Sequence, residues 1–125
     1  MKTIFAFFVV SLFSTSLLFG QKPVLIYNGT LELTGSTYPG IIATIPEATY
    51  EVVQKNWIKT IESGTRSKAV YDNGRWTLFG ANISSVSPTP MNVYSKLENQ
   101  DSLVRLVVAM ELKKDDFIQT GIHES

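Results

Sequence analysis

Residues 45–63, IPEATYEVVQKNWIKTIES, contain the pattern that decides the fold. Large apolar side chains recur in this stretch at spacings of three, four and four residues, which places them on one face of an α-helix. These side chains are Tyr50, Val53, Trp57 and Ile61. Charged side chains occupy the other face, namely Glu51, Lys55, Lys59 and Glu62. The stretch therefore predicts one amphipathic helix over about residues 48–62.

The ends of this helix carry typical start and stop signals. Pro46 precedes the helix and Gly64 follows it, and both residue types are common at those positions. Two interpretations of the first turn are open. Either Thr49 caps the helix, or Thr44 and Glu47 form a capping box one turn earlier.

Residues 103–112 are the clearest strand in the chain. Every second residue is apolar, which gives one continuous apolar face formed by Val104, Leu106, Val108, Met110 and Leu112. The other face mixes apolar and charged residues, from Leu103 to Glu111. This pattern is typical of a central strand whose apolar face lies on the core. We expect the apolar stripe of the helix to pack against that face.

Two antiparallel hairpins are predicted in the second half of the chain. Residues 91–98 alternate in polarity and are joined to the strand at 103–112 by a polar turn at residues 99–101. Asn73-Gly74 is a strong hairpin signal because both positions of a tight turn need positive φ. It joins residues 68–71 to residues 75–83.

The longer arm of the second hairpin contains an irregularity. The apolar side changes around Gly80, with Trp76 and Leu78 before it and Phe79, Ala81 and Ile83 pointing the other way. Such a change predicts a β-bulge at the glycine. Two prolines, at positions 88 and 90, then predict an extended loop over residues 84–89.

The N-terminal part predicts further strands. Asn28-Gly29 is a possible tight turn between residues 24–27 and 30–34, and Tyr38-Pro39-Gly40 predicts another turn. Residues 41–45 then form a short strand that leads into the helix. The element order predicts an α+β fold, an antiparallel sheet of about five to seven strands with one amphipathic helix on one face.

Residues 1–20, MKTIFAFFVVSLFSTSLLFG, resemble a signal peptide. Lys2 provides the positive start, an apolar run follows, and Gly20 is small enough for cleavage after it. We therefore expect an exported protein, periplasmic or secreted, whose mature part is a single domain over residues 21–125. The alternative is an uncleaved N-terminal anchor. No cysteine is available for lipid attachment, so we expect no stable membrane anchor after cleavage.

The amino-acid composition argues against several kinds of function. The chain has 11 basic and 11 acidic residues and no long basic run, which argues against nucleic-acid binding. The lack of cysteine excludes a disulfide framework, a thiol nucleophile and a Cys-ligated zinc site.

No residue can be assigned as catalytic, cofactor-binding or metal-binding, and no cofactor is implied. His123, the one histidine, lies close to the end of the chain, where a catalytic base is poorly held. Glu47 and Glu51 could form a carboxylate pair, although such residues more often complement a helix start. Asp115-Asp116 could help to bind a cation, but one of them more readily caps a helix beginning at Phe117.

Other surface candidates are weaker. The Ser- and Thr-rich stretch at residues 84–90 could be an exposed contact loop. Tyr71 and Tyr94 project from predicted strands and could line a groove, although packing in the core or at an edge is the more common role.

Two stretches resemble a known group of proteins. Residues 45–63 and SPTPMNVYSKLENQDSLVRLVVAMEL at 87–112 are similar to uncharacterised secreted proteins of Bacteroidetes-type bacteria. The resemblance covers about residues 41–120 and implies no activity, ligand or catalytic residue. Members of that group continue into a further helical segment beyond the region that corresponds to residues 115–121. The resemblance therefore implies a shortened chain that exposes apolar surface and self-associates.

Three functional hypotheses follow. The first is a non-enzymatic envelope or secreted module that binds a protein or a small apolar ligand. The second is a small hydrolase of envelope polymers, which requires at least two carboxylates to converge among Glu47, Glu51, Asp72, Glu98, Glu111, Asp115 and Asp116. The third is a truncated structural stub with no separate function.

Overall fold

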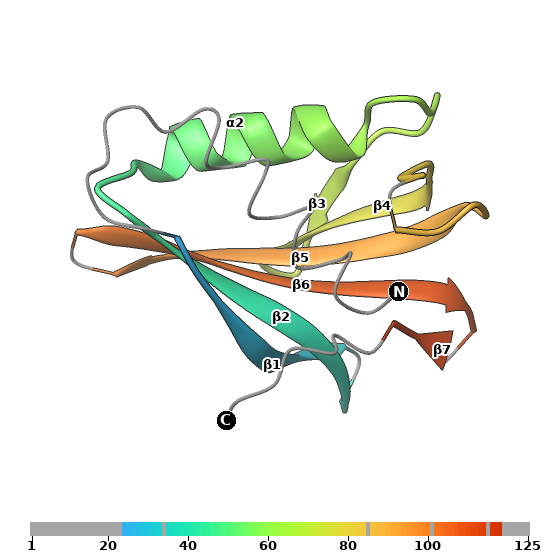
Figure 1. Cartoon of the computed structure of the whole chain (residues 1–125), viewed down its shortest axis with the longest axis horizontal. Coiled ribbons are helices and arrows are strands. Elements are labelled where there is room, and N and C mark those ends of the chain that lie inside the picture. Colours follow the sequence, from blue (N-terminus) through green and yellow to red (C-terminus); the bar gives the residue numbers. More distant parts are fainter. Residues whose placement is uncertain (1–23, 34, 85, 101, 115, 119–125) are drawn as a thin grey trace.

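A computed structural model of the chain describes residues 24–33, 35–84, 86–100, 102–114 and 116–118. One helix lies across one face of a seven-stranded antiparallel sheet (Figure 1), which confirms the predicted α+β fold. The strands are β1 (Leu25–Leu33), β2 (Ser36–Pro46), β3 (Val70–Asp72), β4 (Arg75–Ala81), β5 (Met91–Gln100), β6 (Leu103–Lys113) and β7 (Asp116–Phe117), and the helix is α2 (Tyr50–Ile61). The predicted signal peptide lies outside the described residues.

The strands follow the order β1-β2-β6-β5-β4-β3, and β7 pairs with β6 off this path. Strand β6 is central, as its sequence predicts, because it pairs with β2, β5 and β7. Pairing with β2 ends at Val108, whereas pairing with β5 continues as far as Glu111. Strand β7 therefore takes the place of β2 along the same edge of β6, and Ile118 N donates to Met110 O at 2.8 Å.

Three of the four residues of the predicted apolar stripe of α2 are buried against the sheet, and the fourth, Tyr50, is partly buried. Val53, Trp57 and Ile61 have 1% exposure or less, and they share one core cluster with the apolar face of β6. Trp57 also donates from Nε1 to Ser95 Oγ on β5 at 2.8 Å. The helix therefore contacts β5 directly and shares one core cluster with β6, and the indole N–H has a partner inside the core.

Leu112 departs from the predicted core face of β6. Its side chain is 37% exposed, whereas Met110 is fully buried. The pairing of β6 with β7 shifts register between Glu111 and Lys113, which interrupts the alternation of faces at Leu112.

The start of α2 decides between the two predicted caps. Thr49 has extended backbone angles, and its hydroxyl accepts from Val52 N at 3.3 Å. The capping box of Thr44 and Glu47 is wrong because Thr44 pairs within the sheet. Glu47 instead has a positive φ of 56° and donates its N–H to Ser102 O at 2.8 Å. This bond ties the exit of β2 to the β5–β6 connection.

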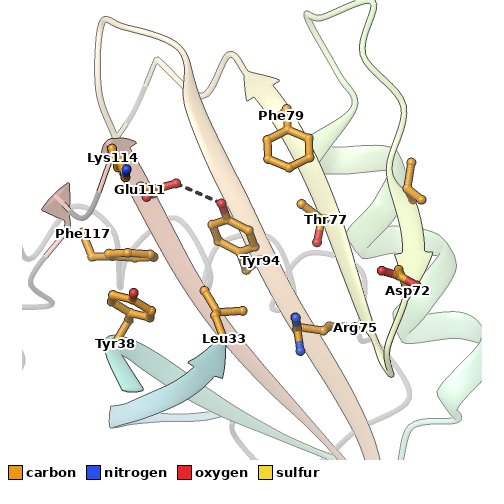
Figure 2. A pocket seen from close by; sticks show the side chains of 11 residues that line it. Leu33, Tyr38, Asp72, Arg75, Thr77, Phe79, Tyr94, Glu111, Lys114 and Phe117 are labelled. Carbon is orange, nitrogen blue, oxygen red and sulfur yellow. Dashed lines mark hydrogen bonds between the residues drawn. The ribbon is translucent and has the colours of Figure 1, made fainter. Parts of the chain in front are cut away.

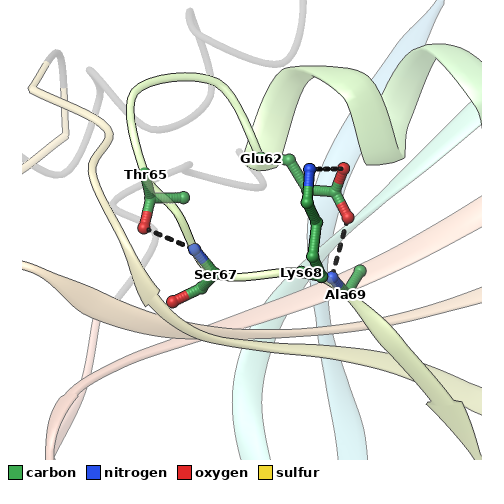
Figure 3. A network of polar contacts seen from close by, with 5 residues as sticks. All are labelled: Glu62, Thr65, Ser67, Lys68 and Ala69. Atoms are coloured by element: carbon green, nitrogen blue, oxygen red, sulfur yellow. Dashed lines mark hydrogen bonds and ion pairs between the residues drawn. The ribbon is translucent and has the colours of Figure 1, made fainter.

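The Asn73-Gly74 hairpin is confirmed, with positive φ at both residues. Strand β3 begins two residues later than predicted, because the preceding backbone is bonded to the helix end (Figure 3). Glu62 accepts from Ala69 N at 2.8 Å and lies 4.0 Å from the ammonium group of Lys68. Thr65 Oγ1 accepts from Ser67 N at 3.2 Å within the same connection.

The β-bulge at Gly80 is confirmed, but the predicted change of the apolar side at this glycine is wrong. The pairing of β4 with β5 shifts between Leu78 and Ala81, and Gly80 has a φ of 82°. Ala81 and Ile83 lie in the same core cluster as Leu78. The bulge therefore returns the chain to the helix side directly after Phe79, which lies on the opposite face with Arg75 and Thr77.

The predicted turn at Asn28-Gly29 is wrong, because β1 runs through these residues in one strand. Gly29 lies opposite Gly40 in β2, and the chain turns later, where Leu33 pairs with Ser36. A Cβ at Gly29 would collide with the side chain of Ile42. The glycine is thus needed for close approach of a side chain and not for a turn.

The predicted turn at Tyr38-Pro39-Gly40 is also wrong, because these residues belong to β2. Pro39 pairs with Thr30 of the edge strand β1. A Cβ at Gly40 would collide with the carbonyl oxygen of Val108. Gly40 therefore lets β2 pass close to β6 at the point where their pairing ends.

Three further local predictions are wrong. Residues Asn99 and Gln100 pair with β6, so the β5–β6 turn is shorter than expected. The stretch after Ile83 is not extended, because Val86 N and Ser87 N both donate to Ile83 O and both residues are buried. The helix expected to begin at Phe117 is replaced by β7, because this segment pairs with the edge of β6 that β2 has left.

Candidate functional site: a groove on the helix-free face

The face of the sheet opposite α2 is called the helix-free face, because no helix of the described residues covers it, and it carries a second, smaller apolar cluster. Its buried members are Leu31, Leu33, Ile42, Val107, Ala109 and Phe117, and Tyr38 and Tyr94 pack against them. Alternation along each strand explains this set, since neighbouring residues on β6 point to opposite faces. Val108 faces α2, whereas Val107 and Ala109 face away from it.

A groove of about 470 Å³ lies along this face (Figure 2). Four aromatic residues line it, one from each of four strands: Tyr38 of β2, Phe79 of β4, Tyr94 of β5 and Phe117 of β7. The other residues that line it are Leu33, Val70, Asp72, Arg75, Thr77, Glu111 and Lys114. The volume is within the range of about 300–1,000 Å³ that is typical of small-ligand sites.

The aromatic rings form a continuous series across the groove. Tyr38 and Phe117 stack with ring centroids 4.3 Å apart, and Phe117 lies 6.0 Å from Tyr94. Phe79 meets Tyr94 edge to face at 6.3 Å. Both arrangements are favourable for aromatic pairs. Each of the four rings therefore packs against at least one other ring of the groove.

The backbone irregularities described above bring these rings together. Phe117 reaches the groove because β7 replaces β2 beside β6. Tyr38 lies in the part of β2 that extends beyond its pairing with β6. Phe79 reaches the same face immediately before the bulge at Gly80.

A hydrogen-bonded carboxylate lies at one end of the groove. Glu111 is 9% exposed and accepts at Oε1 from Tyr94 OH at 2.9 Å and from Asn92 Nδ2 at 3.1 Å. The side-chain oxygen Oδ1 of Asn92 accepts from Gly80 N at 3.3 Å, which links this cluster to the bulge. Burial, followed by the hydrogen bond to Glu111, raises the pKa of Tyr94 to about 12. Tyr94 is therefore a neutral donor to Glu111 near neutral pH.

The groove has a carboxylate and a cation at each end. Glu111 and Lys114 lie at one end, and Asp72 and Arg75, which pair across the β3–β4 hairpin, lie at the other (Figure 2). Glu111 and Asp72 are on strands three places apart in the sheet. At about 4.8 Å per strand, this separates their backbones by about 14 Å across the sheet alone.

The carboxylates singled out in the sequence that fall in the described residues lie at different places in the fold. Glu47 and Glu51 are both exposed, and Glu47 precedes the helix, so they do not share a helix face. Glu98 contacts Lys96 at 3.3 Å and Arg105 at 3.6 Å on another part of the sheet. Asp116 is exposed in β7.

Two candidates, Asp115 and His123, lie outside the described residues. Within the described part of the chain, no group of three or more histidine, aspartate or glutamate side chains is placed to hold a metal ion.

Of the two tyrosines considered as groove residues, only Tyr94 lines the groove. Tyr71 is 55% exposed, and its ring centroid lies 5.2 Å from that of Trp76, a residue on the helix side of the sheet. Sequence reasoning missed Tyr38, Phe79 and Phe117 as members of one site. The sequence feature that could have indicated this site is Glu111, a lone acidic residue on an otherwise apolar stretch of a central strand.

Comparisons of the chain with protein-family models, curated proteins and solved structures returned no match.

Among the helices in the described ranges, none combines the length and the hydropathy that a membrane crossing needs.

Proposed function

We propose that this protein is an exported, non-enzymatic module that binds a small ligand with an apolar surface in the aromatic groove of the helix-free face. The observation that carries the proposal is the set of aromatic rings from four strands around one depression of about 470 Å³. The rings are held by mutual packing, so the groove is preformed.

Exposed apolar surface in the groove supplies the binding energy. Phe79 is 60% exposed and Val70 is 58% exposed, and both line the groove. Burial of a side chain as large as phenylalanine stabilises by about 1.5–3 kcal/mol. Because 60% of Phe79 is exposed, a ligand that covers it would gain about 1–2 kcal/mol, which corresponds to about 5- to 30-fold in affinity.

The positions of the acids favour binding over the hydrolase alternative. Paired catalytic carboxyl groups of glycosidases lie about 5–9.5 Å apart. The two carboxylates that line the groove, Glu111 and Asp72, are on strands three places apart, about 14 Å across the sheet. Glu111 also accepts two hydrogen bonds from neighbouring strand β5, which suits a positioning role.

Calorimetric titration with 4-ethylphenol, a small aromatic probe with one hydroxyl group, tests the proposal. We expect saturable binding to the mature protein and about tenfold weaker binding to Phe79→Ala. Tyr71→Ala is the matched control, because Tyr71 is an aromatic residue of similar exposure that lies outside the groove. Equal binding by both variants would contradict the assignment of the groove. Failure of the wild type to bind 4-ethylphenol and every saccharide probe named below would contradict a small-ligand function.

Export is a separate part of the proposal and rests on residues 1–20. The intact mass of the natural protein should correspond to a chain that begins at or within a few residues of Gln21. A mass that includes Met1 would contradict cleavage.

A further inference from the structure

The polar chemistry of the groove is the same at both ends. Each end combines one carboxylate with one cation, Glu111 with Lys114 and Asp72 with Arg75. Tyr94 lies between these two ends, with Phe117 and Tyr38 on the side of Glu111 and Phe79 on the opposite side (Figure 2). The groove therefore offers hydrogen-bond donors and acceptors at both ends without a net charge.

This balance argues against two classes of ligand. A strongly charged ligand would meet a group of like charge at either end, which is unfavourable in a partly desolvated site. A pure hydrocarbon would cover the polar groups without replacing their hydrogen bonds to water. A hydroxyl group suits both members of each pair, because it donates to a carboxylate and accepts from an ammonium or guanidinium group.

The central part of the groove also suits a ligand that carries hydroxyl and C–H groups. Tyr94 donates its hydroxyl hydrogen to Glu111, so its ring is held in a fixed position on the groove surface. Thr77 lies between Tyr94 and the Asp72–Arg75 end and carries a hydroxyl group that can donate or accept. The exposed ring of Phe79 presents an apolar face with a negative quadrupole, which favours contact with C–H groups.

We infer that the groove binds a neutral oligosaccharide, and this inference rests on the proposed function. Sugar rings combine C–H faces, which contact the aromatic rings, with hydroxyl groups around the rim. A chain of sugar rings places hydroxyl groups near both polar ends, whose strands lie about 14 Å apart across the sheet. The groove recognises the chain through its faces and hydroxyl groups and cleaves no bond.

Calorimetric titration with cellohexaose, maltohexaose and N-acetylchitohexaose tests this inference, beside 4-ethylphenol as the aromatic probe. We expect at least one of these hexasaccharides to bind saturably and to be bound about tenfold more weakly by Phe79→Ala and by Arg75→Gln. Tyr71→Ala should bind as the wild type does. Because the ligand is neutral, affinity should change little with added salt. Chemical unfolding of each variant checks that it is folded.

The other results of this experiment overturn one or both proposals. Binding of 4-ethylphenol without any hexasaccharide would overturn the saccharide inference and leave the small-ligand function in place. Tighter binding of an acidic oligosaccharide, hexagalacturonic acid, than of any neutral one would overturn the neutral class. Binding of neither probe type would overturn both the inference and the proposed function.

Discussion

The two faces of the sheet differ in what covers them. On one face, α2 buries Trp57 and Ile61 completely against the apolar residues of the central strands. On the other face, a smaller cluster surrounds an open aromatic groove in which Phe79 remains 60% exposed. The difference indicates that the helix-covered face stabilises the fold, whereas the helix-free face is available for binding.

Strand β5 shows this division between two neighbouring residues. Ser95 points toward α2 and accepts from the buried indole of Trp57. Tyr94 points the other way and donates to Glu111 in the groove. Substitutions one residue apart should therefore affect different properties of the protein.

The largest effect is expected on the helix side. Trp57→Ala removes a fully buried side chain and should lower the free energy of unfolding by about 3–5 kcal/mol. Chemical denaturation measures this change. A stability equal to that of the wild type would contradict the packing of α2 on the sheet.

A smaller loss is expected from Ser95→Ala. This substitution removes the acceptor of Trp57 Nε1 and leaves the indole N–H buried without that bond, which costs about 1–3 kcal/mol. Denaturation of Ser84→Ala provides the control, because Ser84 is exposed and its substitution should change stability by less than about 0.5 kcal/mol. Equal stability of the two variants would contradict a structural role for the bond.

Alkaline pH tests the groove side. The pKa of Tyr94 is raised from 10.0 to about 12 in the folded protein, so the unfolded chain loses this proton first as pH rises. The contribution of Tyr94 to stability is complete below pH 10 and is lost as pH rises toward 12. Tyr94→Phe should therefore show a smaller fall in stability across this window.

Tyr50 also has a raised pKa, chiefly because of burial, and it remains in the Tyr94→Phe variant. The comparison of unfolding free energies between wild type and Tyr94→Phe at each pH isolates Tyr94. Identical pH profiles would contradict the raised pKa of Tyr94, which burial and the hydrogen bond to Glu111 cause.

The smallest effect on stability is expected from Phe79→Ala. Since Phe79 is mostly exposed and its one ring contact among the described residues is with Tyr94, its removal should lower the free energy of unfolding by no more than about 1.5 kcal/mol. Its effect on binding should be large, as described above. A large loss of stability would show that Phe79 supports the fold and would blur the distinction between the two faces.

The helix-covered face was largely predictable from sequence, and the groove was not. Periodicity located the helix stripe and the core face of β6, because burial of one face imposes a regular pattern. The groove depends on three departures from regularity: the bulge beside Phe79, the extension of β2 beyond β6 and the pairing of β7. Each of these is set by strand pairing between distant segments.

Glycines misled the sequence reasoning for a related reason. The local sequence predicts turns at Gly29 and Gly40, but each glycine lies within a strand and allows a neighbouring group to pack closely against its backbone. Their surroundings come from Ile42 and from Val108, which lie 13 and 68 residues further along the chain. Local turn propensity therefore could not distinguish the two roles.

The most direct test of the division between the two faces is a map of amide chemical-shift changes during titration with 4-ethylphenol. We predict saturable changes concentrated in β4, β5 and β7 around Phe79, Tyr94 and Phe117, with α2 little affected. Saturable changes concentrated in α2 or along β1, with the groove residues unchanged, would contradict the account.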